Sequence, residues 1–148
     1  MTSNSPSRNR QDYSIWTPVS IRYSDQDPNR HVNNVAITAF LESGRTGMLR
    51  EIFPKGALPV GSMVLASLTV DYLKEILFPG TVDVGARLAS VGQRSFKGHF
   101  AIFQNDVCCV TSSSVNVFFD SATRTSASPS PDAQAALDRH IAVHGLIG

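Results

Sequence analysis

The chain has 148 residues, of which 42% are hydrophobic, and its formal net charge at pH 7 is +1. These values predict one soluble globular domain with a hydrophobic core, and the near-neutral charge gives no electrostatic reason to expect binding to nucleic acid or to an anionic membrane. No run is long and apolar enough to cross a bilayer, and residues 1–14 lack the hydrophobic stretch of a secretory signal, so we expect a cytoplasmic protein.

Residues 1–14 are polar and are expected to form a flexible leader. Alternating apolar and polar side chains over residues 16–24 predict a first strand. Apolar residues at helical spacing then predict a long helix over residues 33–52. Gly44 and Gly47 are unfavourable within a helix, so they indicate that another element approaches the helix backbone closely.

Four antiparallel strands are predicted between residues 64 and 119, because apolar side chains alternate there between turn sequences. These turn sequences are Pro79-Gly80, Gly92-Gln93 and Asn105-Asp106. A Ser/Pro segment and a short helix follow, so we expect a central domain over residues 15–125 and a C-terminal piece over residues 126–148. A single long helix is available to cover one sheet, which indicates the α+β class.

The two cysteines, Cys108 and Cys109, are adjacent in a predicted strand. Their side chains should point to opposite faces of the sheet, so we expect free thiols, as is usual in a reducing compartment. Two cysteines without a nearby pair of histidines do not form a zinc-binding pattern, and we expect no metal site.

The segment from Asp25 to Asn34, DQDPNRHVNN, is the most informative part of the chain, because it places two carboxylates, a histidine and several amides directly before the long helix. Asp27, Asn29 and His31 alternate, so in an extended loop their side chains can face the same way. Acids and amides at the start of a helix can hold and polarise a carbonyl group. The simpler interpretation is an ordinary helix N-terminus with Asp and Asn caps, but it accounts for only one or two of these residues.

This motif and the order of the elements resemble the hotdog-fold acyl thioesterases, in particular the branch of the 4-hydroxybenzoyl-CoA thioesterases and the acyl-ACP thioesterases. The resemblance covers about residues 17–120. It is carried by residues 22–27 (RYSDQD), 29–34 (NRHVNN), 42–45 (ESGR), 70–73 (VDYL), 79–80 (PG) and 94–96 (RSF). It implies a curved five-stranded antiparallel sheet wrapped around one long central helix, and a homodimer or tetramer with active sites at the subunit interface.

The resemblance also implies roles for the motif residues. Asp27 matches the catalytic carboxylate, which acts as a base or as a nucleophile, and Asn29 and His31 match the residues that assist it. Some relatives carry a second catalytic carboxylate later in the chain, and Glu75 and Asp71 are its candidates here.

A thioester is already electrophilic, so an enzyme that cleaves it must mainly supply a nucleophile and stabilise an oxyanion. The backbone amides of Val32, Asn33 and Asn34, at the positive end of the predicted helix, are the expected oxyanion donors. The chain departs from the family at Ile37, where many relatives carry a tyrosine, and this departure concerns the lining of the acyl pocket.

A coenzyme A substrate needs contacts to its phosphates. Arg94, Ser95 and Lys97, at a predicted hairpin turn, are the candidates, with Arg87 and Lys74 as further possibilities. A solvated turn explains the same charges. We expect an acyl-CoA or an acyl-carrier thioester as substrate and no cofactor other than the coenzyme A of the substrate itself.

Several polar residues have simpler structural interpretations. Asp25 is expected to pair with Arg22 or to cap the turn, and Glu42 and Arg45 are expected to form a local ion pair on the helix. The histidines expected to serve packing or to lie at the surface are His99, His140 and His144.

Two other functions remain open at this point. A hotdog-fold hydratase or dehydratase of enoyl- or 3-hydroxyacyl thioesters usually spaces its acid and histidine further apart, with a proline after the asparagine, whereas only three residues separate Asp27 from His31 here. A non-catalytic acyl-thioester binding module would be expected to lack Asp27. The sequence therefore favours a thioester hydrolase.

Overall fold

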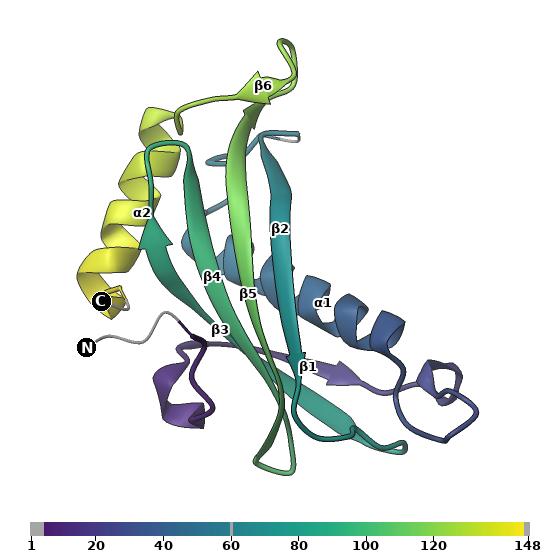
Figure 1. Cartoon of the computed structure of the whole chain (residues 1–148). Coiled ribbons are helices and arrows are strands. Elements are labelled where there is room, and N and C mark those ends of the chain that lie inside the picture. The colour runs from purple at the N-terminus through teal and green to yellow at the C-terminus, as the bar shows by residue number, and fades with distance from the viewer. Residues whose placement is uncertain (1–4, 60, 147–148) are drawn as a thin grey trace.

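In the computed structural model, which describes residues 5–59 and 61–146, one antiparallel sheet curves around a long helix (Figure 1). The strands follow the order β1-β3-β4-β5-β2, and each neighbouring pair is antiparallel. The five main strands are β1 (Ile15–Ser20), β2 (Met63–Tyr72), β3 (Thr81–Val91), β4 (Ser95–Gln104) and β5 (Val107–Asp120), and the short β6 (Thr125–Ser126) pairs with the end of β5. The helices are α1 (Asn34–Ile52) and α2 (Pro131–His144). The expected curved sheet around one long helix is confirmed.

Helix α1 lies against the concave face of the sheet, where it packs on β1, β3 and β4. A Cβ atom on Gly44 would overlap the side chain of Val84, and one on Gly47 would overlap Thr17, so both glycines permit the close approach that the sequence indicated. The residues of α1 that are buried in this contact are Ala36, Ile37, Phe40, Leu41, Gly44, Met48 and Ile52.

The two faces of β5 carry the two cysteines, as expected. Cys109 belongs to the main core under α1, whereas Cys108 packs with Tyr13 and Phe103 in a small cluster on the other face of the sheet. Both thiols are free. Burial is the main cause that raises the pKa of each thiol.

Arg10 and Tyr13 contact the sheet, which differs from the flexible leader expected for residues 1–14. The Tyr13 side chain is buried, and its ring meets Phe103 edge-on. Arg10 bonds to Asp83 at 2.9 Å and lies 4.3 Å from the centre of the Trp16 ring. The aromatic contacts therefore anchor a segment whose polar composition suggested disorder.

The C-terminal segment forms a helix, α2, after the Ser/Pro stretch. Ser130 caps α2, because its Oγ accepts a hydrogen bond from the Ala133 N–H at 3.2 Å, and Pro131 occupies the first turn. Ala133, Ala136 and Leu137 bury this helix against the main core. Within the described residues, neither helix is long and apolar enough to span a membrane.

Candidate active site

The loop between β1 and α1 is held by Asp25. One of its oxygens accepts a hydrogen bond from the Arg22 backbone N–H at 2.7 Å, and the other contacts the Arg22 guanidinium at 2.8 Å. This guanidinium holds the pKa of the buried Asp25 carboxyl below its ordinary value. The pairing closes a short 3-10 turn, Tyr23–Asp25, which is why β1 ends at Ser20 instead of continuing to residue 24. Asp25 is structural, as expected.

Asp27 has a fixed and half-exposed carboxylate. Its Oδ1 accepts hydrogen bonds from the backbone N–H groups of Asn29, at 2.9 Å, and His31, at 3.2 Å. Its own backbone N–H donates to the His31 carbonyl at 2.9 Å. No described side chain or backbone group bonds to Oδ2. The loop therefore orients this carboxylate and leaves one oxygen available for chemistry.

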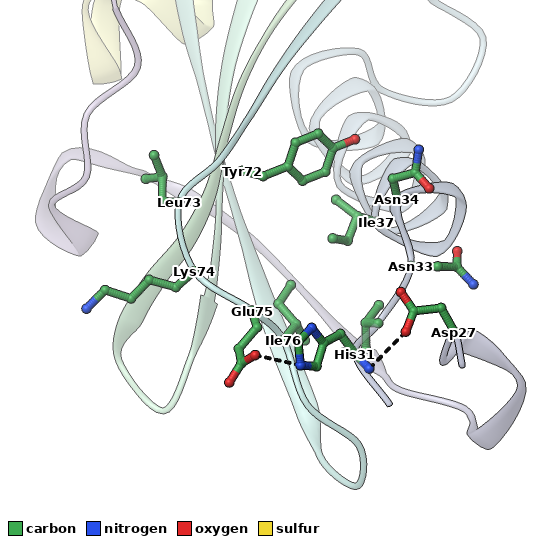
Figure 2. A pocket seen from close by; sticks show the side chains of 11 residues that line it. Asp27, His31, Asn33, Asn34, Ile37, Tyr72, Leu73, Lys74, Glu75 and Ile76 are labelled. Atoms are coloured by element: carbon green, nitrogen blue, oxygen red, sulfur yellow. Dashed lines mark hydrogen bonds and ion pairs between the residues drawn. The ribbon is translucent and has the colours of Figure 1, made fainter. Parts of the chain in front are cut away.

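A second loop, between β2 and β3, is joined to the Asp27 loop. The Val32 N–H donates to the Ile76 carbonyl at 2.9 Å, and His31 Nε2 lies 2.8 Å from a carboxylate oxygen of Glu75 (Figure 2). The His31 imidazole thus meets Glu75, while the backbone N–H of the same residue meets Asp27. Of the two candidates for a second carboxylate, the structure brings Glu75 into the site. Asp71 is exposed on β2 and does not line the cavity.

The start of α1 supplies one free amide to the site. Asn33 is the N-cap, and its Oδ1 accepts a hydrogen bond from the Ala36 N–H at 2.8 Å. The Asn33 N–H donates to the Asp25 carbonyl at 2.9 Å, and the Val32 N–H is engaged by Ile76. Two of the three expected oxyanion donors are therefore occupied. Among the described residues, nothing accepts from the N–H of Asn34, the first residue of the helix, where such groups normally lack a partner within the helix.

These elements enclose a cavity of about 430 Å³, within the usual range for small-molecule sites. Tyr72 from β2 and Ile37 from α1 give it an apolar side, and Figure 2 shows both near the start of the helix. The residues that line it are Asp27, His31, Val32, Asn33, Asn34, Ile37, Tyr72, Leu73, Lys74, Glu75 and Ile76.

The remaining expected site residues lie outside this cavity. Asn29 is exposed at the tip of the loop and reaches Asp27 only through its backbone N–H. The Arg94–Lys97 segment begins β4 at the opposite end of the sheet. There Ser95 is paired with Val117 of β5, and Val117 is paired in turn with Val64 of β2. From there to Tyr72 is eight residues of strand, about 26 Å at about 3.3 Å per residue. Within one chain, Arg94, Ser95 and Lys97 do not reach the cavity.

Sequence reasoning missed the contribution of Tyr72 and Ile76 to the site. The polar pair Lys74-Glu75 directly after a strand was a signal that this loop faces solvent or a ligand. Nothing in the local pattern places this loop against the Asp27 loop, because the contact depends on how β2 and α1 lie in the fold. Within the described residues, no three His, Cys, Asp or Glu side chains are grouped so that they could hold a metal ion.

Comparison with known proteins agrees with this arrangement. The family model of the thioesterase-like superfamily matches residues 21–137, a range that includes Asp27, His31 and Glu75. The structure is similar to that of a predicted thioesterase from Bacillus stearothermophilus, with 26% identity, a TM-score of 0.77 and coverage of 85% of this chain and 95% of that chain. It is also similar to a thioesterase from Thermus thermophilus in complex with coenzyme A and zinc, with 26% identity, a TM-score of 0.75 and coverage of 84% and 98% of the two chains.

A sequence relative is the uncharacterized protein YsmA of Bacillus subtilis (strain 168), which is 25% identical over 88 residues. The match spans 60% of that protein and 60% of this chain. The matched family, the half-barrel sheet and the central helix agree, and the chain therefore belongs to the thioesterase-like superfamily and has the hotdog fold.

Proposed function

We propose that this protein hydrolyses acyl-CoA or acyl-carrier thioesters to a free carboxylic acid and a thiol. The observation that carries the proposal is the position of Asp27: its carboxylate is held by two amides in the wall of a cavity that also contains the free first amide of α1. A carboxylate and an oxyanion donor in one cavity are the two groups that thioester hydrolysis requires. The superfamily membership and the CoA-bound structure from Thermus thermophilus support this assignment.

In this mechanism the carbonyl oxygen of the thioester lies at the N-terminus of α1, where the Asn34 N–H and the helix dipole stabilise the developing oxyanion. Asp27 either accepts a proton from an attacking water or attacks the carbonyl carbon itself. The tetrahedral intermediate then expels the thiolate, and the C–S bond breaks. In the base route, the proton taken by Asp27 passes to the leaving sulfur. In the nucleophile route, water hydrolyses the acyl-aspartate.

His31 and Glu75 act together in this proposal. The Glu75 carboxylate holds the imidazole at 2.8 Å, and the backbone N–H of His31 holds Asp27. Glu75 therefore positions His31 and, through the loop, the catalytic carboxylate. Asn29 assists Asp27 through its backbone N–H, which donates to Asp27 Oδ1, and not through its side chain.

The free edge of β2 indicates how a second copy would complete the site. Among the described strands β2 pairs only with β5, and large apolar side chains along it, Val64, Leu65 and Tyr72, are exposed. Soluble proteins normally cover such an edge. We propose that two copies pair β2 against β2 about a two-fold axis. Antiparallel pairing would bring the start of one β2, and the neighbouring Arg94–Lys97 segment, toward the cavity of the partner, where these residues could contact coenzyme A.

A single assay distinguishes hydrolysis from the alternative functions. Thiol release is measured with short, long and aromatic acyl-CoAs, and hydration of an enoyl-CoA is followed in parallel. The proposal predicts thiol and free acid in equal amounts, with no hydration. Hydration without thiol release would assign the protein to the hydratases. Tight binding without either reaction would assign it to the non-catalytic binding modules.

A further inference from the structure

A second cavity, of about 500 Å³, meets the first at Asp27. Its lining residues are Tyr23, Ser24, Gln26, Asp27, Arg30 and Phe78, and Asp27 is the one residue that lines both cavities. An acyl-CoA has its reacting carbon between two long arms, the acyl group and the pantetheine with its nucleotide. We propose that the second cavity binds the nucleotide end of coenzyme A, with the adenine on Tyr23 and Phe78 and a phosphate on Arg30. This inference rests on the proposed function.

Two aromatic side chains, Tyr23 and Phe78, line this cavity. Tyr23 is 78% exposed, and its ring meets Phe78 at a centroid distance of 5.8 Å and an angle of 87°. The backbone of Tyr23 starts the 3-10 turn that Arg22 and Asp25 clamp, and its carbonyl accepts a hydrogen bond from the Gln26 side chain at 3.1 Å. A large exposed aromatic ring on a fixed backbone turn is a stacking surface for a nucleobase.

The cation of this cavity is Arg30. Its side chain is exposed and forms no ion pair with a described carboxylate, in contrast to Arg22, which Asp25 engages. Its backbone adopts φ of 64°, a left-handed conformation that favours glycine over a residue with a long side chain. The Arg30 backbone N–H donates to the Asp27 carbonyl at 2.9 Å, and both residues line this cavity.

The near-neutral charge of the whole chain favours recognition of a phosphate by a local contact with Arg30. A net charge of +1 gives no reason to expect a broad positive surface that would attract an acidic carrier protein. A single free guanidinium beside an aromatic pair matches a phosphate next to a nucleobase, because guanidinium and phosphate form paired hydrogen bonds. We therefore assign the cavity to free coenzyme A and not to a carrier protein.

The test compares one acyl group on coenzyme A with the same acyl group on N-acetylcysteamine, which lacks the nucleotide. For Arg30→Gln and Tyr23→Ala we expect kcat/KM for the acyl-CoA to fall about tenfold, mainly through KM, as for the loss of one charged hydrogen bond or one stacked base. The N-acetylcysteamine thioester should react as with the wild-type protein. Arg139→Gln, which changes an exposed arginine of α2 that lines neither cavity, is the matched control and should leave both substrates unaffected.

Arg30→Gly separates a ligand contact from a folding defect, because glycine accepts φ of 64° without strain. This variant should be at least as heat-stable as the wild type and should show the same selective loss. Equal losses on both substrates, no loss on either, or the same selective loss in Arg139→Gln would overturn the assignment. So would a loss confined to acyl groups on a carrier protein.

Binding of coenzyme A itself, measured by calorimetry, keeps this test independent of hydrolysis. If the wild-type protein releases no thiol from any thioester, the proposed function fails, and the affinity for coenzyme A still decides the present inference. We then expect about tenfold weaker binding for Arg30→Gln, corresponding to one charged hydrogen bond. Equal affinity in the wild type and this variant would contradict the site.

Discussion

Asp25 and Asp27 lie two residues apart, and their different surroundings give them different tasks. Asp25 is buried and bonded to Arg22 through both oxygens, so it stabilises the loop. Asp27 is half-exposed and lines the cavity, with one oxygen bonded to two amides and the other bonded to no described group. The sequence placed both acids in one motif, and these contacts distinguish the structural role of Asp25 from the catalytic role that we propose for Asp27.

Asp25→Asn tests the structural role through pH. The pKa of Asp25 is lowered chiefly by its hydrogen bond with Arg22, so the ionised carboxylate stabilises the folded state. This contribution is complete above the unfolded pKa of about 4 and is lost as the pH falls through the lower folded value. We expect the variant to have a lower Tm than the wild type at pH 7, and the difference to shrink below about pH 4. A difference that stays constant with pH would show that the ion pair is not its cause.

Glu75→Gln tests whether this residue positions His31. The amide keeps the shape of the side chain and removes the charged hydrogen-bond acceptor at 2.8 Å from the imidazole. We expect kcat to fall about tenfold, the value of a hydrogen bond to a charged group of about 1.5 kcal/mol. A wild-type rate would exclude this positioning role of Glu75.

At the scale of elements, the spacing of apolar residues in the sequence predicted the structural features that depend on local sequence. The long helix, the hairpin turns at Gly92-Gln93 and Asn105-Asp106, and the opposite orientations of Cys108 and Cys109 follow from local sequence, and the structure confirms them. The availability of the oxyanion amides was not predictable in this way. The Val32 and Asn33 amides are occupied by Ile76 and Asp25, and the first of these contacts joins residues 44 positions apart, from 32 to 76.

The N-terminal leader shows another limit of prediction from local sequence. Its polar composition predicted flexibility, whereas one aromatic side chain, Tyr13, secures residues 10–14 through contacts with Trp16 and Phe103. Composition averages over a segment and does not reveal a single anchoring residue. The position of the Arg94–Lys97 segment far from the cavity also required the strand register, which no local pattern provides.

Gly44→Ala tests the close contact between α1 and β3. The added Cβ would overlap the Val84 side chain, so helix and sheet must separate even though alanine favours the helix itself. We expect the free energy of unfolding, measured with denaturant, to fall by about 1–3 kcal/mol. The exposed neighbour Ser43→Ala is the control and should change it by less than about 0.5 kcal/mol. A more stable Gly44→Ala would mean that α1 packs less closely than the structure shows.

At the scale of the whole molecule, the edge of β2, which pairs only with β5 among the described strands, supports the dimer that we propose. Val64 lies on this edge and is 39% exposed, and Val107 is similarly exposed at 41% in the β4–β5 hairpin, away from the edge. The two valines therefore form a matched pair for testing the proposed dimer.

We expect Val64→Lys to reduce the molecular mass in solution from that of a dimer to that of a 16.0 kDa monomer, because a charge on the edge opposes strand pairing. Val107→Lys should remain dimeric. Sedimentation or light scattering measures the mass, and the same samples report whether acyl-CoA turnover falls with dissociation. A dimer that persists in Val64→Lys together with unchanged activity would place the subunit contact elsewhere.

The most direct test of the whole account is kcat/KM for acyl-CoA hydrolysis by Asp27→Asn, measured beside Asp71→Asn, which changes the other carboxylate candidate outside the cavity. If Asp27 is the base or nucleophile, its variant should fold normally and lose at least about 100-fold in kcat/KM, while Asp71→Asn stays near the wild-type rate. Hydrolysis at the wild-type rate by a folded Asp27→Asn would contradict the central claim that this carboxylate, beside the start of α1, cleaves the thioester.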